Sequence, residues 1–273
     1  MDDILVPTDF STCADHAAEF AMQLAAKISG EVTFIHLIGL DNDKLKSDKD
    51  HFYSDVSSSV AKINSKLKVY IDEAQSRKIK ALKAIHFDKN YKSLVAYILE
   101  NDTYMVVMGS HGHSKTKELL MGSSALKVLR HSPVPVVVVN GDYPNQDVNT
   151  ILMISDFEDV PATGFRKIVA IARRWKMELH FLYVNTARHF RTSRDIFARM
   201  NAYTKSAKDV CTRQHICNAY NVEEGVKDFC EQNPGLIVSM VSHYHRGASL
   251  YIHGSVTESL IHKLSVPVLS VHD

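Results

Sequence analysis

The chain has 273 residues, 45% of them hydrophobic and 23% charged, a composition that excludes collagen-like, disordered and coiled-coil proteins. Its 32 Lys and Arg residues balance 31 Asp and Glu residues, so the net charge of +1 gives no sign of a nucleic-acid or anionic-membrane partner. The length suits two domains of ordinary size.

In chain order, the first half predicts five buried strands that alternate with four helices. We expect the strands at residues 4–7, 32–38, 80–87, 105–108 and 134–139, and the helices at 11–29, 53–77, 92–100 and 123–131. The strands are continuous apolar runs rich in β-branched residues, which is typical of parallel strands covered on both faces.

The second half repeats the first. Ile4-Leu5 and Asp9-Phe10 recur 147 residues later, and Gly122-Ser123 recurs 132 residues later, so the second copy has lost 15 residues in its middle. Its strands are expected at 150–154, 178–184, 213–219, 236–241 and 266–271. We therefore predict domains at residues 1–142 and 148–273, joined by a linker at 141–149 that is rich in turn-forming residues.

The alternation of strands and helices predicts an α/β protein with two tandem, doubly wound, five-stranded parallel sheets. Right-handed crossovers favour the Rossmann-like strand order 3-2-1-4-5 in each domain. In such sheets a ligand binds beyond the carboxyl ends of strands one and four, where the winding reverses. Asp9 follows strand one, and residues 109–112 follow strand four, so both are expected at that crevice. Asp9 has a second interpretation as the residue that caps the first helix.

A glycine pattern follows the fourth strand. Gly109 is separated by two residues from Gly112, and nine further residues lead to Gly122, Ser123 and Ser124 at the start of a helix. Glycines let the backbone approach a ligand closely, and the free N–H groups of a helix start bind phosphate oxygens. The pattern predicts a phosphate cradle, whereas no Walker motif and no GxGxxG after a strand support a P-loop or a dinucleotide site.

This glycine spacing, together with PTDFS at 7–11 and SPVPVVVV at 132–139, resembles the universal stress protein family in its tandem form. The resemblance implies an adenine-nucleotide-binding fold and a nucleotide such as ATP as the ligand. It implies that adenosine contacts Asp9 and Leu37, that the ribose lies beside Met108 and Gly109, and that the phosphates are held by Gly112, Gly122, Ser123 and Ser124. His111, in the same loop, is expected either to neutralise phosphate charge or to be solvated.

The second copy departs from the pattern at the glycines. Val241 stands in the place of Gly109 and Tyr244 in the place of Gly112, while Asp156 is retained. Bulky side chains at these positions are expected to close the second crevice to a triphosphate, so the nucleotide, with or without Mg²⁺, is expected in the first domain only.

We therefore expect a cytoplasmic stress-response protein that binds ATP or a related adenine nucleotide as a regulatory ligand, with a structural or sensing second domain. The beginning of the chain, MDDILVPTDF, has no basic leader before an apolar run, and no membrane partner is expected. In the family, the strand-five edges of two domains often pair. The resemblance thus implies an intramolecular pseudo-dimer through residues 136–139 and 268–271, with a homodimer left open.

Two other functions stay open: a slow ATPase or phosphotransferase, and an interaction module that binds no nucleotide. Since the chain has no Ser-His-Asp set and no paired carboxylates, no catalytic residue is assigned. The histidines at 243, 245 and 253 are interpreted as surface residues rather than as a metal site. The basic stretch 188–199 is interpreted as an amphipathic helix that buries Phe190, Ile196 and Phe197, the alternative being a face for an acidic partner.

Overall fold

The computed structural model describes residues 2–39, 49–87, 91–111, 123–141, 143–144, 146–242 and 254–273. The first unit contains β1 (Asp3–Pro7), α1 (Thr12–Ile28), β2 (Glu31–Leu37), α3 (Lys49–Ser76), β3 (Lys80–His86), α4 (Tyr91–Glu100), β4 (Met105–Gly109), α5 (Ser123–His131) and β5 (Val136–Val139). The second unit contains β6 (Thr150–Ile154), α6 (Ala162–Trp175), β7 (Glu178–Thr186), the 3-10 helix η1 (Ala187–His189), α7 (Ser193–Ser206), β8 (Thr212–Ala219), α8 (Val222–Gln232), β9 (Leu236–Ser242), α9 (Gly254–Lys263) and β10 (Val268–His272).

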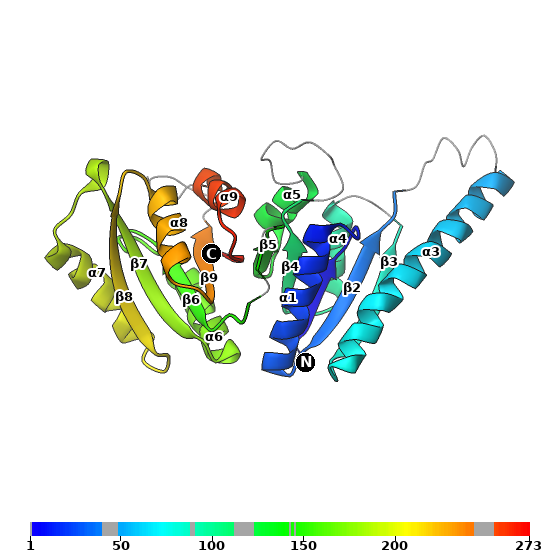
Figure 1. Cartoon of the computed structure of the whole chain (residues 1–273), viewed down its shortest axis with the longest axis horizontal. Helices are drawn as coiled ribbons and strands as arrows, with labels where there is room; N and C mark the ends of the chain where they lie inside the picture. The colour runs from blue at the N-terminus through cyan, green and yellow to red at the C-terminus, as the bar shows by residue number, and fades with distance from the viewer. Residues whose placement is uncertain are drawn as a thin grey trace.

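All these strands belong to one 10-stranded sheet, in the order β3-β2-β1-β4-β5-β10-β9-β6-β7-β8. The predicted order 3-2-1-4-5 is confirmed in the first unit and recurs in the second (Figure 1). Within each unit the neighbouring strands are parallel, whereas β5 and β10 pair antiparallel, with Val137 opposite Leu269. The two units therefore share one sheet through the edges of their last strands.

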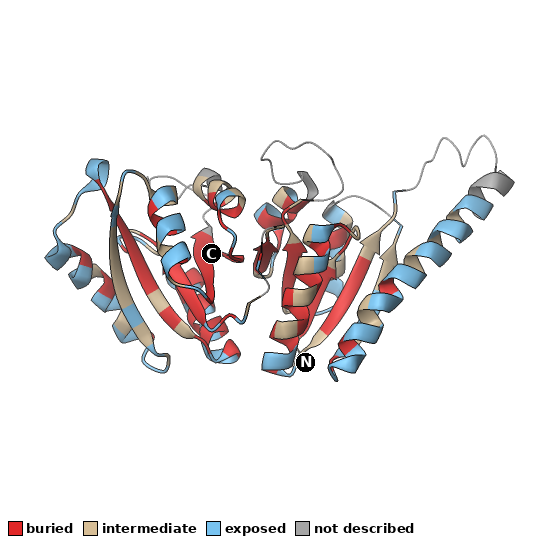
Figure 2. Ribbon diagram, in the orientation of Figure 1, coloured by how far each residue is buried: buried red, intermediate tan, exposed pale blue. Residues whose placement is uncertain are grey.

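The inner strands β1, β4, β5, β6 and β10 are buried on both faces, which explains why they are continuous apolar runs. The edge strands β3 and β8 are partly exposed and carry polar residues. In β1, alternate residues join different cores: Ile4 packs in the cluster on one face, and Leu5 packs in the cluster on the other. Each cluster continues into the second unit, where Ile151 and Leu152 take the same places. Figure 2 shows buried strands at the centre of each unit and exposed residues on the outer sides of the helices.

The units differ most in the helix that follows their second strand. Helix α3 has 28 residues and begins at Lys49, earlier than predicted, whereas its counterpart α7 has 14. This difference accounts for the shorter second copy, and Figure 1 shows α3 running past the end of the sheet. Across the stretches that the structure describes, no helix is both long enough and apolar enough to cross a bilayer.

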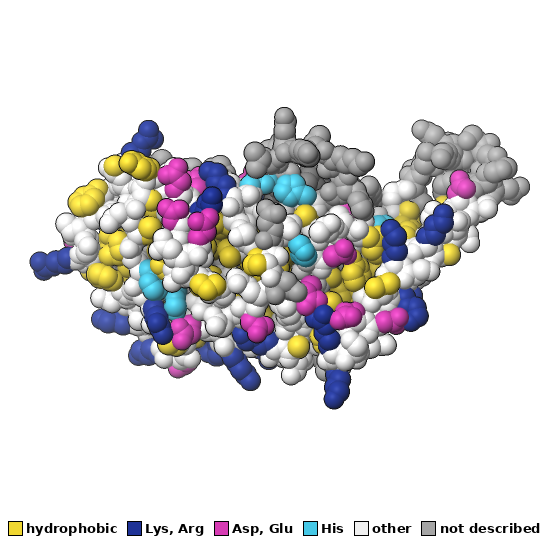
Figure 3. All heavy atoms as spheres, in the orientation of Figure 1, with side chains coloured by type: hydrophobic (Ala, Val, Ile, Leu, Met, Phe, Trp, Pro, Cys, Tyr) yellow, Lys and Arg dark blue, Asp and Glu magenta, His cyan; other side chains and the backbone are white. Residues whose placement is uncertain are grey.

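The segment between the units is held against the first unit. Tyr143 is buried and its hydroxyl donates to the Gln146 carbonyl at 2.6 Å. Lys27 of α1 donates to the carbonyl of Val148 at 2.9 Å, and Val148 is itself buried. These contacts fix the segment between the units to the first unit. On the face drawn in Figure 3, acidic and basic side chains are interspersed over both units.

Candidate functional site

The turn between β1 and α1 brings Asp9 to the carboxyl end of the sheet. Phe10 has φ of 62°, a left-handed conformation that is unusual for a bulky residue. Hydrogen bonds hold this turn: the Phe10 N–H donates to Thr8 Oγ1 at 3.0 Å, and the Ser11 N–H donates to Asp9 Oδ1 at 3.1 Å. Ser11 rather than Asp9 caps α1, because its hydroxyl accepts from the Ala14 N–H at 3.3 Å. Asp9 is thus a half-buried carboxylate whose position is fixed by the turn.

The end of β2 forms the second wall. Leu37, the last residue of β2, is half-buried, and the preceding residue, His36, donates from Nδ1 to the Thr8 carbonyl at 2.7 Å. Because a carbonyl oxygen only accepts, Nδ1 carries a proton. The His36 ring stacks on Phe10, with 4.8 Å between the ring centroids.

Helix α3 closes the same side with aromatic and charged groups. Tyr70 lies 6.2 Å from Phe10 and 5.0 Å from Phe34, measured between ring centroids. Its hydroxyl donates to the Asp15 carboxylate, and burial followed by this hydrogen bond raises the pKa of Tyr70. The ammonium of Lys66 lies 4.9 Å from the centre of the Phe10 ring, within the range of a cation–π contact. None of these residues is predicted for the site from the sequence.

The end of β4 packs directly on α1. A Cβ added at Gly109 would lie 2.8 Å from the backbone carbonyl carbon of Cys13 and 2.9 Å from its oxygen. Gly109 is therefore required by the contact between strand and helix, whatever ligand the crevice accepts. Met108, one residue earlier, is buried against the opposite core.

Ser110 and His111 then connect three parts of the molecule. The fully buried Ser110 donates from Oγ to Asn140 Oδ1 at 3.2 Å and accepts from His111 Nδ1 at 2.8 Å. The His111 carbonyl accepts from the Ser11 hydroxyl at 3.4 Å. The ends of β1 and β4 thus meet, as the strand order predicts. The structure brings together Asp9, Leu37, Met108, Gly109 and His111, and α5 begins at Ser123. Gly112, Gly122 and the side chains of Ser123 and Ser124 lie outside the described residues.

The second unit repeats the β1–α1 turn at the end of β6. Phe157 has φ of 53°, and its N–H donates to Ser155 Oγ at 3.0 Å. The N–H of Glu158 donates to Asp156 Oδ1 at 3.1 Å, as that of Ser11 does to Asp9. The carboxylate position is therefore built alike in both units.

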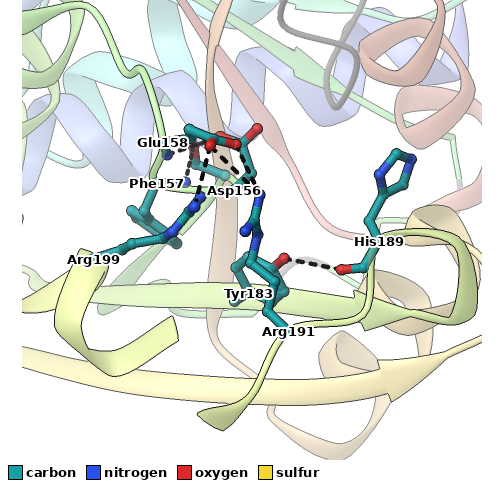
Figure 4. A network of polar contacts seen from close by, with 8 residues as sticks. Asp156, Phe157, Glu158, Tyr183, His189, Arg191 and Arg199 are labelled. Carbon is teal, nitrogen blue, oxygen red and sulfur yellow. Dashed lines mark hydrogen bonds and ion pairs between the residues drawn. The ribbon is translucent and has the colours of Figure 1, made fainter. Parts of the chain in front are cut away.

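Charged side chains surround this second turn. Figure 4 shows Arg191 and Arg199 directed at Glu158, beside Asp156. The guanidinium groups lie 3.2 and 3.1 Å from the Glu158 carboxylate, and together they lower its pKa, Arg199 having the larger effect. In the first unit, Ser11 occupies the position equivalent to Glu158.

The chain after β7 folds back toward the turn that follows β6. The Arg191 N–H donates to Asn185 Oδ1 at 3.0 Å, and Asn185 Nδ2 donates to the Arg191 carbonyl at 3.2 Å. Tyr183, at the position equivalent to His36, donates to the His189 carbonyl at 3.3 Å (Figure 4). Residues 187–192 are thus fixed beside the ends of β6 and β7.

Two sequence-based interpretations of the second unit need correction. The Val241 side chain does not stand in the crevice: it packs on α6, where a Cβ added at Gly164 would lie 2.4 Å from Val241 Cγ1. Val241 therefore does not block phosphate sterically. Tyr244, the other residue expected to do so, lies outside the described residues. In the basic stretch, Ile196 is buried as expected, but Phe190 is 71% and Phe197 40% exposed.

In the portion of the chain that the structure describes, no three or more His, Cys, Asp or Glu side chains are grouped so that they could hold a metal ion. The histidines at 243, 245 and 253 lie outside that portion.

Comparisons with known proteins place this geometry in context. The model of the universal stress protein family matches residues 1–140. A universal stress protein from Methanocaldococcus jannaschii is 28% identical over 153 residues, which cover 50% of this chain and 93% of that protein. The crystal structure of a universal stress protein from Archaeoglobus fulgidus has a TM-score of 0.70 at 24% identity, covering 98% of this chain and 97% of its own. A Pseudomonas aeruginosa protein of unknown function has a TM-score of 0.61 at 12% identity, covering 100% and 92%. The Archaeoglobus fulgidus and Pseudomonas aeruginosa structures therefore share the fold of this chain over both of its units.

Proposed function

Since the match over residues 1–140 shows that the chain belongs to the universal stress protein family, we propose that its first unit binds ATP or a related adenine nucleotide as a regulatory ligand. The observation that carries the proposal is the meeting of the ends of β1 and β4 at the carboxyl edge of the sheet. There a fixed, half-buried carboxylate, Asp9, lies at the end of the strand next to β4. The proposed cellular role is a cytoplasmic stress response.

The residues of the first crevice suit the parts of such a ligand. The Asp9 carboxylate has lone pairs beyond the one used by Ser11, so it can accept from a ribose hydroxyl or an adenine amine. Leu37 offers an apolar wall, and Met108 and Gly109 lie at the end of the neighbouring strand. The first turn of α5, which begins at Ser123, would receive the phosphates on its free N–H groups, after the loop that contains Gly112 and Gly122.

The second unit is proposed to bind no nucleotide and to serve a structural or sensing role. Its turn retains Asp156, but two arginines and Glu158 lie beside it as an ion-paired group. A nucleotide entering there would have to separate Glu158 from Arg191 and Arg199 or place its own phosphates beside the Glu158 carboxylate. The chain is therefore proposed to bind one nucleotide, with or without Mg²⁺.

The test is calorimetric titration of ATP into the full chain and into two matched variants, Asp9→Asn and Asp156→Asn. Asparagine retains the Oδ1 acceptor that each turn uses, so both turns should persist. We expect one ATP per chain, a loss of affinity of about tenfold or more in Asp9→Asn because a charge-assisted hydrogen bond is weakened, and no change in Asp156→Asn.

Other outcomes decide against parts of the proposal. Two ATP molecules per chain would contradict the single site, and loss of one of them in Asp156→Asn would locate the second. No heat and no nucleotide released on denaturing the purified protein would contradict nucleotide binding and favour an interaction module. Steady release of inorganic phosphate from ATP would contradict a purely regulatory ligand.

A further inference from the structure

Each unit uses the end of its last strand to hold the last helix of the other unit. His272, the final residue of β10, donates from Nε2 to the carbonyl of Leu129 in α5 at 2.7 Å. Asn140, which follows β5, donates from Nδ2 to the carbonyls of Ile261 and Leu264 at 3.2 and 3.1 Å. Leu129 and Ile261 are equivalent positions of the repeat, as are Asn140 and His272. The contact is therefore reciprocal, although its donors are different residue types.

The contact at Leu129 satisfies a group that α5 cannot satisfy itself. The last four carbonyls of a helix have no intrahelical partner, and Leu129 lies among them in α5. A carbonyl oxygen only accepts, so Nε2 of His272 carries a proton. Burial lowers the pKa of His272, which favours the neutral ring, and the neutral ring with its proton on Nε2 still donates this hydrogen bond.

The second unit holds the same end of α5 at another point. Arg130, the next residue along α5, pairs with Glu258 of α9, with Nε 3.1 Å from the carboxylate oxygen. Val128 and Leu129 are buried against the sheet. The carboxyl end of α5 is thus fixed by its own unit and by two side chains of the other.

We propose that His272 is a positioning residue for the phosphate end of the nucleotide site in the first unit, and that it acts through α5. This inference rests on the proposed function. With 9 residues, α5 is about 14 Å long, short enough to move as one rigid body, so a tether at Leu129 also sets the place of the first turn at Ser123. Asp9 and Leu37 lie on other elements, β1–α1 and β2, whereas the His272 ring donates its hydrogen bond to α5. The second unit thereby tunes phosphate binding without touching the ligand.

The test compares His272→Leu with His272→Asn in the full chain. Leucine removes the donor, whereas asparagine is the residue that the repeat itself uses at this position, in Asn140. We expect His272→Leu to weaken ATP about threefold to tenfold, the effect of one lost hydrogen bond, while adenosine binding stays unchanged. His272→Asn should bind ATP as the unchanged chain does. His215→Leu, at the far edge of the second unit, is the control for a general loss of packing there.

Hydrogen exchange in the ligand-free protein gives a second measurement, which separates this inference from the proposed function. His272→Leu should speed exchange of the α5 amides and leave those of α4 unchanged. Equal weakening of ATP and adenosine, an unchanged ATP affinity, or an effect of His215→Leu as large as that of His272→Leu would overturn the inference. If the unchanged chain binds neither ligand, the proposed function fails, and so does the positioning role that rests on it. The exchange data then decide separately whether His272 holds α5.

Discussion

Replacing Gly109 with alanine tests whether this glycine serves the packing of β4 on α1. The new methyl group would lie 2.8–2.9 Å from the carbonyl carbon, carbonyl oxygen and Cβ of Cys13, so backbone rather than a flexible side chain must move. Overpacking of this kind costs about 1–3 kcal/mol. Removing a glycine from a strand returns roughly 0.5–1 kcal/mol through the unfolded chain. We therefore expect Gly109→Ala to lower the free energy of unfolding by about 1 kcal/mol at the middle of both ranges, and by at most about 2.5 kcal/mol.

The matched control is Gly141→Ala, because this glycine also faces Cys13. Of the residues that the structure describes, its added Cβ would meet only the Cys13 sulfur, at 3.1 Å, and that side chain can rotate away. We expect a change below about 0.5 kcal/mol, the usual range for substitutions without a specific mechanism. Cys13→Ala should remove even this small effect, but it should not rescue Gly109→Ala, whose contacts are mainly with the backbone.

Urea unfolding of the single variants and of the double variants with Cys13→Ala, followed by circular dichroism, measures these differences through the shift in midpoint at constant slope. A parallel ATP titration asks whether the displaced start of α1 carries Asp9 with it, in which case Gly109→Ala also loses nucleotide affinity. Equal stability of Gly109→Ala and Gly141→Ala would refute the packing argument. Full rescue by Cys13→Ala would show that the clash lies with the side chain.

Three further predictions concern the second unit. Gly164→Ala should destabilise the chain by about 1–3 kcal/mol, because the stiff Val241 side chain lies 2.4 Å from the new Cβ, and Val241→Ala should restore much of the loss in a urea double-mutant cycle. Glu158→Gln should speed hydrogen exchange at residues 187–192, since two guanidinium groups lose their carboxylate; unchanged exchange would contradict this. Burial lowers the pKa of three histidines below the ordinary 6.5: His215, His262 and His272. Their contribution to stability is therefore present above pH 6.5 and lost as the pH falls toward the folded-state values, so urea midpoints should fall below pH 6.5. Urea midpoints that stay constant as the pH falls below 6.5 would contradict the lowered pKa values of these histidines.

The sequence predicts the architecture well because burial on both faces leaves a direct trace in it. Runs such as Val136–Val139 have no polar alternation, and the internal repeat gives the order of elements twice. The start of α3 was predicted less well, since its first turns lack a strong apolar stripe. Nor did the pattern at 190–197 distinguish buried from exposed phenylalanines, because α7 begins only at Ser193 and Phe190 precedes it.

The site was predicted only in part, because its geometry depends on contacts between distant segments. Phe10 and Phe157 both adopt positive φ, which side-chain preferences disfavour, and the repeated Asp-Phe pair was the sole sequence signal for it. From the sequence, Val241 is expected to obstruct the second site, because the sequence does not indicate that Gly164 faces it. The glycine at the strand–helix contact lies on the strand in the first unit, where Gly109 meets Cys13, and on the helix in the second, where Gly164 meets Val241. Neither position alone indicates its partner.

The repeat also explains why the two crevices can differ while the molecule remains nearly symmetric. The strand edges pair around Val137 and Leu269, which are equivalent positions, so the interface constrains both units alike. The crevices lie at the ends of the strands, where Ser11 in one unit and Glu158 in the other change the chemistry without altering the hydrogen bond that each backbone N–H makes. An ion-paired second crevice is therefore compatible with the same turn and the same sheet. Differences in ligand binding between the units should follow from side chains at the turn, and substitutions at position 158 should alter the second crevice without disturbing the first.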